Sequence, residues 1–436
     1  MKTLVLGAGI IGISTAWHLL DEGHEVIVVD RQADAALETS FANGAQISVS
    51  FCEPWASADA PLKVAKWLLR DDSPLLFRPR LDPNQWRWGL AFLGQCNDAA
   101  FERNVQQLVA LGRYSHQALK SLVARTGIEY QRLERGILHF FSSQAELDAG
   151  AAGAELMRRH GVDRRILTRD EVLAVEPALA AYGPRISGGT YTPSDESGDA
   201  RLFTQALARR CEQRGATFLF GHDVLGLDAS GGQVRGVRVQ PRAGGAARTL
   251  AADQFVVALG AFSAPLLRPL GVKLDIYPAK GYSATLRLKH PERASTVSMI
   301  DDARKIAISR LGDQIRIAGT AELAGYDTGL DGRTARVRCA ALVSRYEELF
   351  PGVADASEPN FWAGLRPSTP TNVPYIGRAP RIANLWVNAG HGTLGWTHGA
   401  GSGHALAQLM SGRHPPLEFG FYGPALPQPQ VRVAVA

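Results

Sequence analysis

Cysteine is scarce in this 436-residue chain, and Cys52, Cys96, Cys211 and Cys339 lie far apart without forming a CxxC pair. This spacing argues against a disulfide framework or a zinc site and suits a reducing, cytoplasmic setting. The eleven histidines likewise show no HxxxH or HExxH spacing. We therefore predict no metal site.

Long apolar runs and clusters of basic charge are missing as well. No uncharged run approaches the roughly 20 residues that cross a bilayer. The formal net charge of +5 comes from basic residues dispersed along the chain, and this dispersion does not favour a nucleic-acid partner. A GxGxxG motif begins at residue 7. We expect no signal peptide, because that position leaves no room for an apolar region and a cleavage site.

The first thirty residues predict a strand–turn–helix–strand unit. Apolar runs at 3–6 and 26–29 have the length of buried parallel strands, and a helical pattern covers 13–20. A helix that starts in a glycine-rich turn offers unpaired N–H groups and a partial positive charge to phosphates. In this context GxGxxG predicts a dinucleotide site, although a plain βαβ unit with a glycine-rich turn is the simpler alternative.

Each position of the motif has a physical role. Gly7 permits the tight turn, Gly9 lets a pyrophosphate approach the backbone, and Gly12 allows the helix to pack closely on the strand. Asp30 follows the second strand, where a carboxylate can accept hydrogen bonds from ribose hydroxyls. The same carboxylate would repel a 2′-phosphate, which argues against NADP despite the adjacent Arg31.

The stretch 37–110 is less specific. Residues 37–48 read as a polar loop in which Thr39 or Ser40 could cap a helix and offer a hydroxyl to phosphate. Half of the eight tryptophans fall in 51–110, and 62–70 has the pattern of a basic amphipathic helix. Two helices packed on a core is the favoured interpretation of this region. The alternative is a surface that touches a membrane.

The rest of the chain predicts two interleaved domains. Residues 199–214 read as a helix capped at Asp199, and helix and strand patterns alternate onward to 260. Residues 274–322 are instead rich in antiparallel signals, with Gly312-Asp313 as a hairpin turn. We expect an α/β fold with an α+β insert, in which a Rossmann-like domain interleaves with a mixed or antiparallel-sheet substrate domain. The expected boundaries are 1–50, 195–265 and 364–436 for the first domain, and 51–194 and 266–363 for the second.

A second glycine-rich turn lies near the C-terminus. Residues 385–387 read as a strand and 399–410 as a helix, with three glycines between positions 390 and 395. Such a turn can aim N–H groups at the pyrimidine oxygen of a flavin and stabilise the charge of its reduced ring. The candidates are Gly392, Thr393, Leu394 and Gly395.

These motifs together resemble a known family. The chain is similar to the small subunit of bacterial D-amino acid dehydrogenase, within the FAD-dependent amine and amino-acid oxidoreductases. The resemblance covers nearly the whole length and rests on GAGIIG with Asp30, ALETSFANGAQIS, YPAKGYS, GLRPSTPTNVPYIG and GHGTLGWTHGAGSG. The family often carries a cysteine after the last GW, whereas this chain has THGA at 397–400, which leaves the substrate range open.

The resemblance implies non-covalent FAD and a set of residues around it. The implied FAD-binding residues are Gly7, Gly9, Ile10, Ile11, Gly12, Asp30, Arg31, Ser40, Asn43, Gly44, Gln46, Ile47, Val224, Ala258, Gly260, Gly364, Gly392, Thr393, Leu394, Gly395 and Thr397. Arg366 matches the arginine that holds the substrate carboxylate, a role suited to a planar guanidinium. The alternative for Arg366 is a surface ion pair. Tyr282 and His391 are weaker catalytic candidates, and His391 could equally be a structural turn residue.

The implied activity is oxidative deamination of D-amino acids to 2-oxo acids and ammonia, with electrons passed to a quinone or another non-oxygen acceptor. A peripheral contact with the inner face of the membrane is the matching expectation. One alternative is an oxidase of glycine, sarcosine or proline-like amines that uses dioxygen. Two others are the flavoprotein module of an RNA-modifying protein, which the missing basic tract counts against, and a non-catalytic FAD-binding protein.

Overall fold

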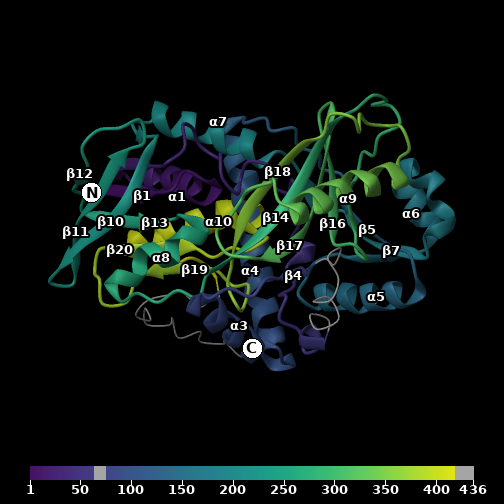
Figure 1. The fold of residues 1–436 in the computed structure, drawn as a ribbon, viewed down its shortest axis with the longest axis horizontal. Coiled ribbons are helices and arrows are strands. Elements are labelled where there is room, and N and C mark those ends of the chain that lie inside the picture. Colours follow the sequence, from purple (N-terminus) through teal and green to yellow (C-terminus); the bar gives the residue numbers. More distant parts are fainter. Residues whose placement is uncertain (63–74, 418–436) are drawn as a thin grey trace, which may run out of the picture.

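In the computed structural model, residues 1–62 and 75–417 are described, and they form two large sheets with helices on their faces (Figure 1). The helices are α1 (Ile10–Asp21), α3 (Pro83–Gln95), α4 (Asp98–Thr126), α5 (Gln144–Arg159), α6 (Arg169–Val175), α7 (Ala200–Gln213), α8 (Ser263–Leu267), α9 (Arg333–Leu349) and α10 (Gly395–Met410). Within these described ranges, no helix is both long enough and apolar enough to cross a bilayer.

The first large sheet has six strands in the order β19-β20-β13-β1-β2-β9. All neighbours are parallel except β19 and β20. The strands are β1 (Lys2–Leu6), β2 (Glu25–Val29), β9 (Thr217–Leu219), β13 (Gln254–Val257), β19 (Tyr375–Arg378) and β20 (Leu385–Ala389). The sheet therefore draws its strands from the start, the middle and the end of the chain.

The second large sheet has nine strands in the order β18-β14-β17-β16-β15-β5-β7-β6, with β4 paired to β17. It is mixed, because β15 runs parallel to β5 and β17 parallel to β4, whereas the other pairs are antiparallel. The strands are β4 (Leu75–Phe77), β5 (Ile137–Phe141), β6 (Arg165–Leu167), β7 (Gly188–Thr192), β14 (Tyr277–Arg287), β15 (Ser298–Asp301), β16 (Ile306–Leu311), β17 (Gln314–Leu323) and β18 (Asn360–Ser368).

Two smaller sheets complete the fold. They comprise β10 (His222–Ser230), β11 (Gln233–Pro241) and β12 (Arg248–Leu250) in one, and β3 (Gln46–Ile47) with β8 (Glu196–Ser197) in the other. This mixed architecture confirms the expected α/β fold with a second, mixed-sheet part.

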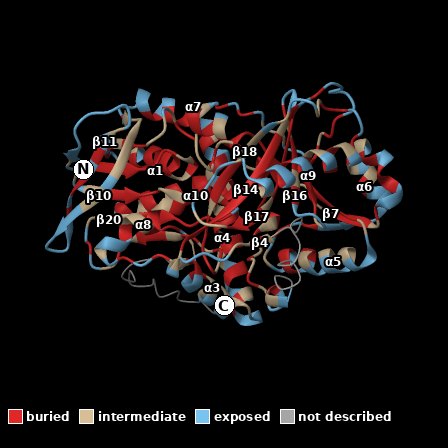
Figure 2. Ribbon diagram, viewed as in Figure 1, coloured by how far each residue is buried: buried red, intermediate tan, exposed pale blue. Residues whose placement is uncertain are grey.

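The core is divided between the two large sheets. Figure 2 shows the central strands buried, whereas α5, α6 and α9 turn exposed faces outward. One cluster packs α1, α7 and α10 around the six-stranded sheet, with Trp17, Phe203 and Trp396 among its buried rings. Another packs α9 on the nine-stranded sheet through residues such as Leu342 and Tyr346.

Several local expectations are confirmed. Asp199 caps α7 by accepting hydrogen bonds from the N–H groups of Arg201 (2.8 Å) and Leu202 (3.0 Å), and Gly312 turns the chain between β16 and β17 with φ +61°. Residues 38–43 form turns, in agreement with the polar loop expected there, and neither Thr39 nor Ser40 caps a helix that follows it. The predicted amphipathic helix at 62–70 lies, from residue 63 on, outside the described residues.

Candidate active site

The glycine motif at the end of β1 has the geometry that its spacing predicts. Gly7 has φ +107°, and a Cβ there would lie 2.5 Å from the carbonyl oxygen of Ala258. A Cβ on Gly12 would lie 1.8 Å from the oxygen of Gly7, so α1 packs directly on the turn. A Cβ on Gly9 would meet only Ser40 Oγ, at 3.5 Å. Gly9 therefore faces open space, as an approaching phosphate requires.

That open space is part of a cavity of about 1230 Å³. Its walls come from both large sheets, from the turn at 388–396 and from α3. The volume exceeds the roughly 300–1,000 Å³ that suffices for a drug-sized ligand. It therefore suits a dinucleotide together with a small substrate.

Most of the predicted site residues line this cavity. The exceptions among them are Gly12, Ile47, Leu394 and Thr397. Gly12 serves packing, as described above, and Ile47 and Leu394 are buried in apolar clusters. Thr397 Oγ1 accepts a hydrogen bond from the N–H of Ser48 at 3.0 Å, so its hydroxyl fixes a neighbouring segment.

Asp30 is buried at the edge of the cavity, between two backbone donors. Its Oδ2 accepts from the N–H of Ala8 at 2.7 Å, and its Oδ1 from the N–H of Gln32 at 2.8 Å. Burial raises the pKa of Asp30 above its usual value, although both hydrogen bonds oppose this. Each carboxylate oxygen has a further lone pair, and this geometry fits a ribose hydroxyl.

Ser40 acts at the start of α1 although it lies thirty residues away. Its Oγ accepts a hydrogen bond from the N–H of Ile10 at 3.1 Å, which satisfies one of the unpaired donors of the first helical turn. The neighbouring Thr39 donates to the carbonyl of Leu365 at 2.9 Å. The polar loop therefore ties the glycine motif to β18 in the other large sheet.

Arg366 lies in β18 opposite Ala279 of β14. Its Nη1 donates to the carbonyl oxygen of Thr320 at 2.6 Å, and Thr320 itself has φ +55°. A Cβ on Gly281 would lie 2.4 Å from the Cζ of Arg366, so the guanidinium rests directly over that glycine. Burial, with Arg338 nearby, lowers the pKa of Arg366 to about 10, which still leaves the side chain cationic at neutral pH.

Tyr282 is placed differently from Arg366. Gly281 pairs with Gly364 and Tyr282 with Ala363, and because successive residues of a strand point to opposite faces, Tyr282 points away from the face that carries Arg366. Its hydroxyl donates to Glu322 Oε2 at 2.5 Å, and its ring packs in the cluster that contains α9. Tyr282 touches the cavity wall, but its hydroxyl is already engaged outside it.

His391 lines the cavity and is also hydrogen-bonded, through Nε2, to Ser402 Oγ at 2.8 Å. Burial, with His398 nearby, holds the pKa of His391 well below its ordinary range, so the ring is neutral at physiological pH. These contacts favour the structural alternative for His391 over an acid–base role.

The turn before α10 offers fewer donors than its sequence predicts. The N–H of Gly392 donates to the carbonyl of Pro367 at 3.0 Å, and the N–H of Leu394 to that of His391 at 2.9 Å. The expected contact with a flavin oxygen therefore rests on the N–H groups of Thr393 and Gly395. Nearby, Asn388 lines the cavity, and its buried Oδ1 has no hydrogen-bond partner among the described residues, as expected beside a ligand that donates.

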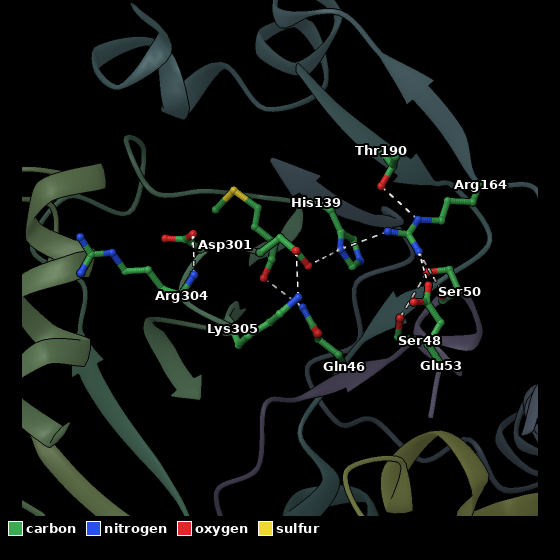
Figure 3. A network of polar contacts seen from close by, with 12 residues as sticks. Gln46, Ser48, Ser50, Glu53, His139, Arg164, Thr190, Asp301, Arg304 and Lys305 are labelled. Atoms are coloured by element: carbon green, nitrogen blue, oxygen red, sulfur yellow. Dashed lines mark hydrogen bonds and ion pairs between the residues drawn. The ribbon is translucent and has the colours of Figure 1, made fainter. Parts of the chain in front are cut away.

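A buried polar network beside the cavity has no signature in the sequence (Figure 3). Arg164, which is 4% exposed, donates to Thr190 Oγ1 (3.0 Å) and Glu53 Oε1 (3.0 Å). Asp195 accepts from Ser50 Oγ at 2.5 Å, and burial raises its pKa to about 6. These contacts hold segment 46–53, which forms part of the cavity wall.

Gln46 shows how that segment joins the second sheet. Its Nε2 donates to Ser298 Oγ (2.8 Å) and to the carbonyl of Met299 (3.1 Å) in β15.

The sequence did not predict the aromatic residues of 51–101 that line the cavity, and no local motif could have found them. They are Phe51, Trp55, Phe77, Trp86, Trp88, Phe92 and Phe101.

The comparisons with known proteins agree with this geometry. A sequence model of the family described as "FAD dependent oxidoreductase" matches residues 2–409. D-amino acid dehydrogenase from Dechloromonas aromatica is 51% identical over 97% of this chain and 99% of that protein. The D-amino acid dehydrogenase of Paramagnetospirillum magneticum is 46% identical, over 95% and 96% of the two chains. The chain therefore belongs to the FAD-dependent oxidoreductases and, within them, to the D-amino acid dehydrogenase family.

A solved structure supports the fold independently. Glycine oxidase from Bacillus cereus superposes with a TM-score of 0.70 over 94% of this chain and 95% of that one. The sequence identity is 22%, so this likeness concerns the fold alone.

Proposed function

We propose that this protein catalyses the oxidative deamination of D-amino acids with FAD bound in the cavity, and that its electrons leave to a quinone rather than to dioxygen. One juxtaposition carries the proposal: a half-buried, cationic Arg366 lines the same cavity as the GxGxxG turn and Asp30. The identity to relatives named D-amino acid dehydrogenase supports the substrate class.

The groups that line the cavity suit the different parts of FAD. Gly9 and the start of α1 would receive the pyrophosphate, and Asp30 would accept hydrogen bonds from the ribose. The orphaned Oδ1 of Asn388 and the N–H groups of Thr393 and Gly395 would lie toward the ring. When bound, FAD supplies the two-electron acceptor for the α-hydrogen of the substrate.

Arg366 would fix the substrate by its carboxylate. A guanidinium carries five N–H donors. Among the described residues, one of these donors bonds to the carbonyl oxygen of Thr320. Two parallel charge-assisted bonds to a carboxylate would orient the α-carbon as well as hold it. Loss of the α-hydrogen with two electrons, and of a proton from nitrogen, yields an imino acid, which water converts to a 2-oxo acid and ammonia.

No protein base is assigned to this reaction, because a substrate with a neutral amine needs none. The engaged hydroxyl of Tyr282 and the neutral, hydrogen-bonded ring of His391 agree with that view. The contribution of the chain is then positioning and electrostatics around the cofactor.

Two further proposals concern the division of the chain into domains and the location of the protein. We propose the domain division 1–50, 195–265 and 364–436 against 51–194 and 266–363. We also propose a cytoplasmic protein that contacts the inner face of the membrane peripherally. The contact should appear as co-sedimentation with anionic vesicles at low salt, and its absence there would refute it.

An anaerobic panel tests the main proposal. D-amino acids should bleach the yellow colour of the enzyme under argon, whereas L-amino acids should not. The reduced enzyme should reoxidise much faster with a soluble quinone than in air. Equal reoxidation rates, or bleaching by glycine and sarcosine instead, would favour an oxygen-using amine oxidase.

A further inference from the structure

Helix α3 is apolar on two opposite faces. Its thirteen residues include one charged side chain, Arg87. On the inner face, Trp88 is 5% exposed and stacks on Phe92 with ring centroids 5.3 Å apart. On the outer face, Trp86, Leu90 and Leu93 are 51%, 71% and 53% exposed. A helix that is apolar all round is ordinarily buried, so the exposed face needs an explanation.

The cavity of the active site extends to this helix. We call the apolar part of the cavity around this helix the aromatic arm; it is lined by Trp55, Phe77, Trp86, Trp88, Leu90, Phe92 and Leu93. Arg366 lines the same cavity. Because Trp86, Leu90 and Leu93 also reach solvent, the aromatic arm connects the site of oxidation with the surface at α3.

Several polar groups beside the aromatic arm are already engaged. Trp88 Nε1 donates to the carbonyl of Ser368 at 2.8 Å, and Trp86 Nε1 to that of Arg80 at 2.9 Å. Gln85 donates to the carbonyl of Leu323 at 3.0 Å and accepts from the N–H of Arg80 at 2.7 Å. A charged ligand would lose its hydration here without replacement, whereas a flat apolar ring could stack on the indoles.

We propose that the aromatic arm binds the electron acceptor, a quinone ring that carries an apolar tail, with the ring inside the arm and the tail over Leu90 and Leu93. This inference rests on the proposed function, which requires an acceptor. The reaction balances: two electrons and two protons pass from reduced FAD to the quinone, which leaves as the hydroquinone and restores oxidised FAD.

The test is a binding titration of the FAD-loaded protein. Quenching of tryptophan fluorescence reports binding of decylubiquinone without turnover, since Trp86 and Trp88 lie in the arm. Leu90→Gln with Leu93→Gln replaces two exposed apolar side chains by a good helix former. The Kd for decylubiquinone should rise about 10-fold, the factor that corresponds to 1.4 kcal/mol, and the KM for that quinone should follow. A quinone with a short tail should lose less affinity.

A matched control separates the arm from general surface effects. Leu202 and Val337 are exposed apolar residues on helices α7 and α9, at 39% and 44%, and do not line the cavity. The pair Leu202→Gln with Val337→Gln should leave the quinone titration unchanged. Anaerobic bleaching by D-alanine is measured on every variant as an independent readout of the substrate end.

Three outcomes would overturn the inference. The first is an unchanged Kd in the α3 pair. The second is an equal loss in quinone binding and in bleaching, because α3 would then support the whole cavity. The third is a dimer that dissociates in the α3 pair while the Kd stays constant, which would identify the outer face as a contact between copies. Absence of bleaching in the unmodified protein would instead refute the proposed function.

Discussion

Gly281→Ala tests the placement of Arg366 without altering any polar group. The new Cβ would lie 2.4 Å from both Cζ and Nη2 of Arg366 and 2.8 Å from Nη1. Carbon atoms in contact normally lie about 3.5–4.0 Å apart, so the guanidinium must move by roughly 1 Å. Gly281 does not have a left-handed φ. An alanine therefore fits its backbone, and the effect acts through the side chain of Arg366.

The expected loss follows from two effects of that displacement. A 1 Å misplacement of a positioning group can cost about 100-fold in rate. Loss of the 2.6 Å bond to Thr320 removes a charge-assisted hydrogen bond of roughly 1.5–3 kcal/mol. We expect kcat/KM for D-alanine to fall about 100-fold, with FAD content and spectrum preserved.

The assay is anaerobic reduction by D-alanine and by D-alaninamide, which lacks the carboxylate. The amide should react poorly with both proteins and lose little further rate in Gly281→Ala. Gly332→Ala serves as the control, because a Cβ at that exposed position meets no atom within 4 Å. Unchanged kcat/KM for D-alanine in Gly281→Ala, with FAD retained, would mean that the carboxylate is not held at Arg366.

Three further predictions concern other parts of the chain. Gly9→Val should give colourless, largely cofactor-free protein, because a branched side chain would occupy the space for the pyrophosphate; full FAD content, measured by absorbance, would contradict the assignment of this turn. Arg366→Lys keeps the charge but loses the fork, so kcat/KM should fall about 10- to 150-fold, and Arg366→Ala should lose more while the FAD spectrum survives; loss of FAD would instead make Arg366 structural. Although burial opposes it, hydrogen bonds from His116 and Arg132 lower the pKa of Glu196 from 4.5 to about 2, so Glu196 should contribute roughly 3 kcal/mol above pH 4.5 that is lost as the pH falls toward 2. In urea unfolding, the stability difference between the unmodified protein and Glu196→Gln should shrink over that window, and a constant difference would contradict the shift.

The GxGxxG turn could be predicted because it depends on residues that are close in the sequence. GxGxxG between two strands requires short-range features only, and the structure reproduces the turn at Gly7 and the close packing at Gly12. The cap at Asp199 and the hairpin at Gly312 are local in the same sense. Each depends on residues within a few positions of one another, which a single sequence displays.

The walls of the cavity depend instead on long-range pairing. The face to which Tyr282 points is set by the register of β14 against β18 and β17. The pairing of β14 with β17 contains an irregularity between Lys280 and Tyr282. A shift of one residue exchanges the two faces of a strand, so no sequence pattern could place that hydroxyl. Ser40 lies in a segment whose sequence predicts only a polar loop, and its hydroxyl serves α1, because the partner N–H is supplied by a distant turn.

The strand order β20-β13-β1-β2 has a consequence for biosynthesis. β1 leaves the ribosome long before its neighbour β13, which begins at Gln254, and before the next strand, β20, which begins at Leu385. Contacts between residues so far apart in the sequence form slowly during folding. The glycine turn that awaits the pyrophosphate is therefore the earliest part of the site to be translated and among the last to be enclosed. We therefore expect cofactor loading to be a late step, so FAD supplied during refolding should matter most after β1 and β20 have both paired with β13.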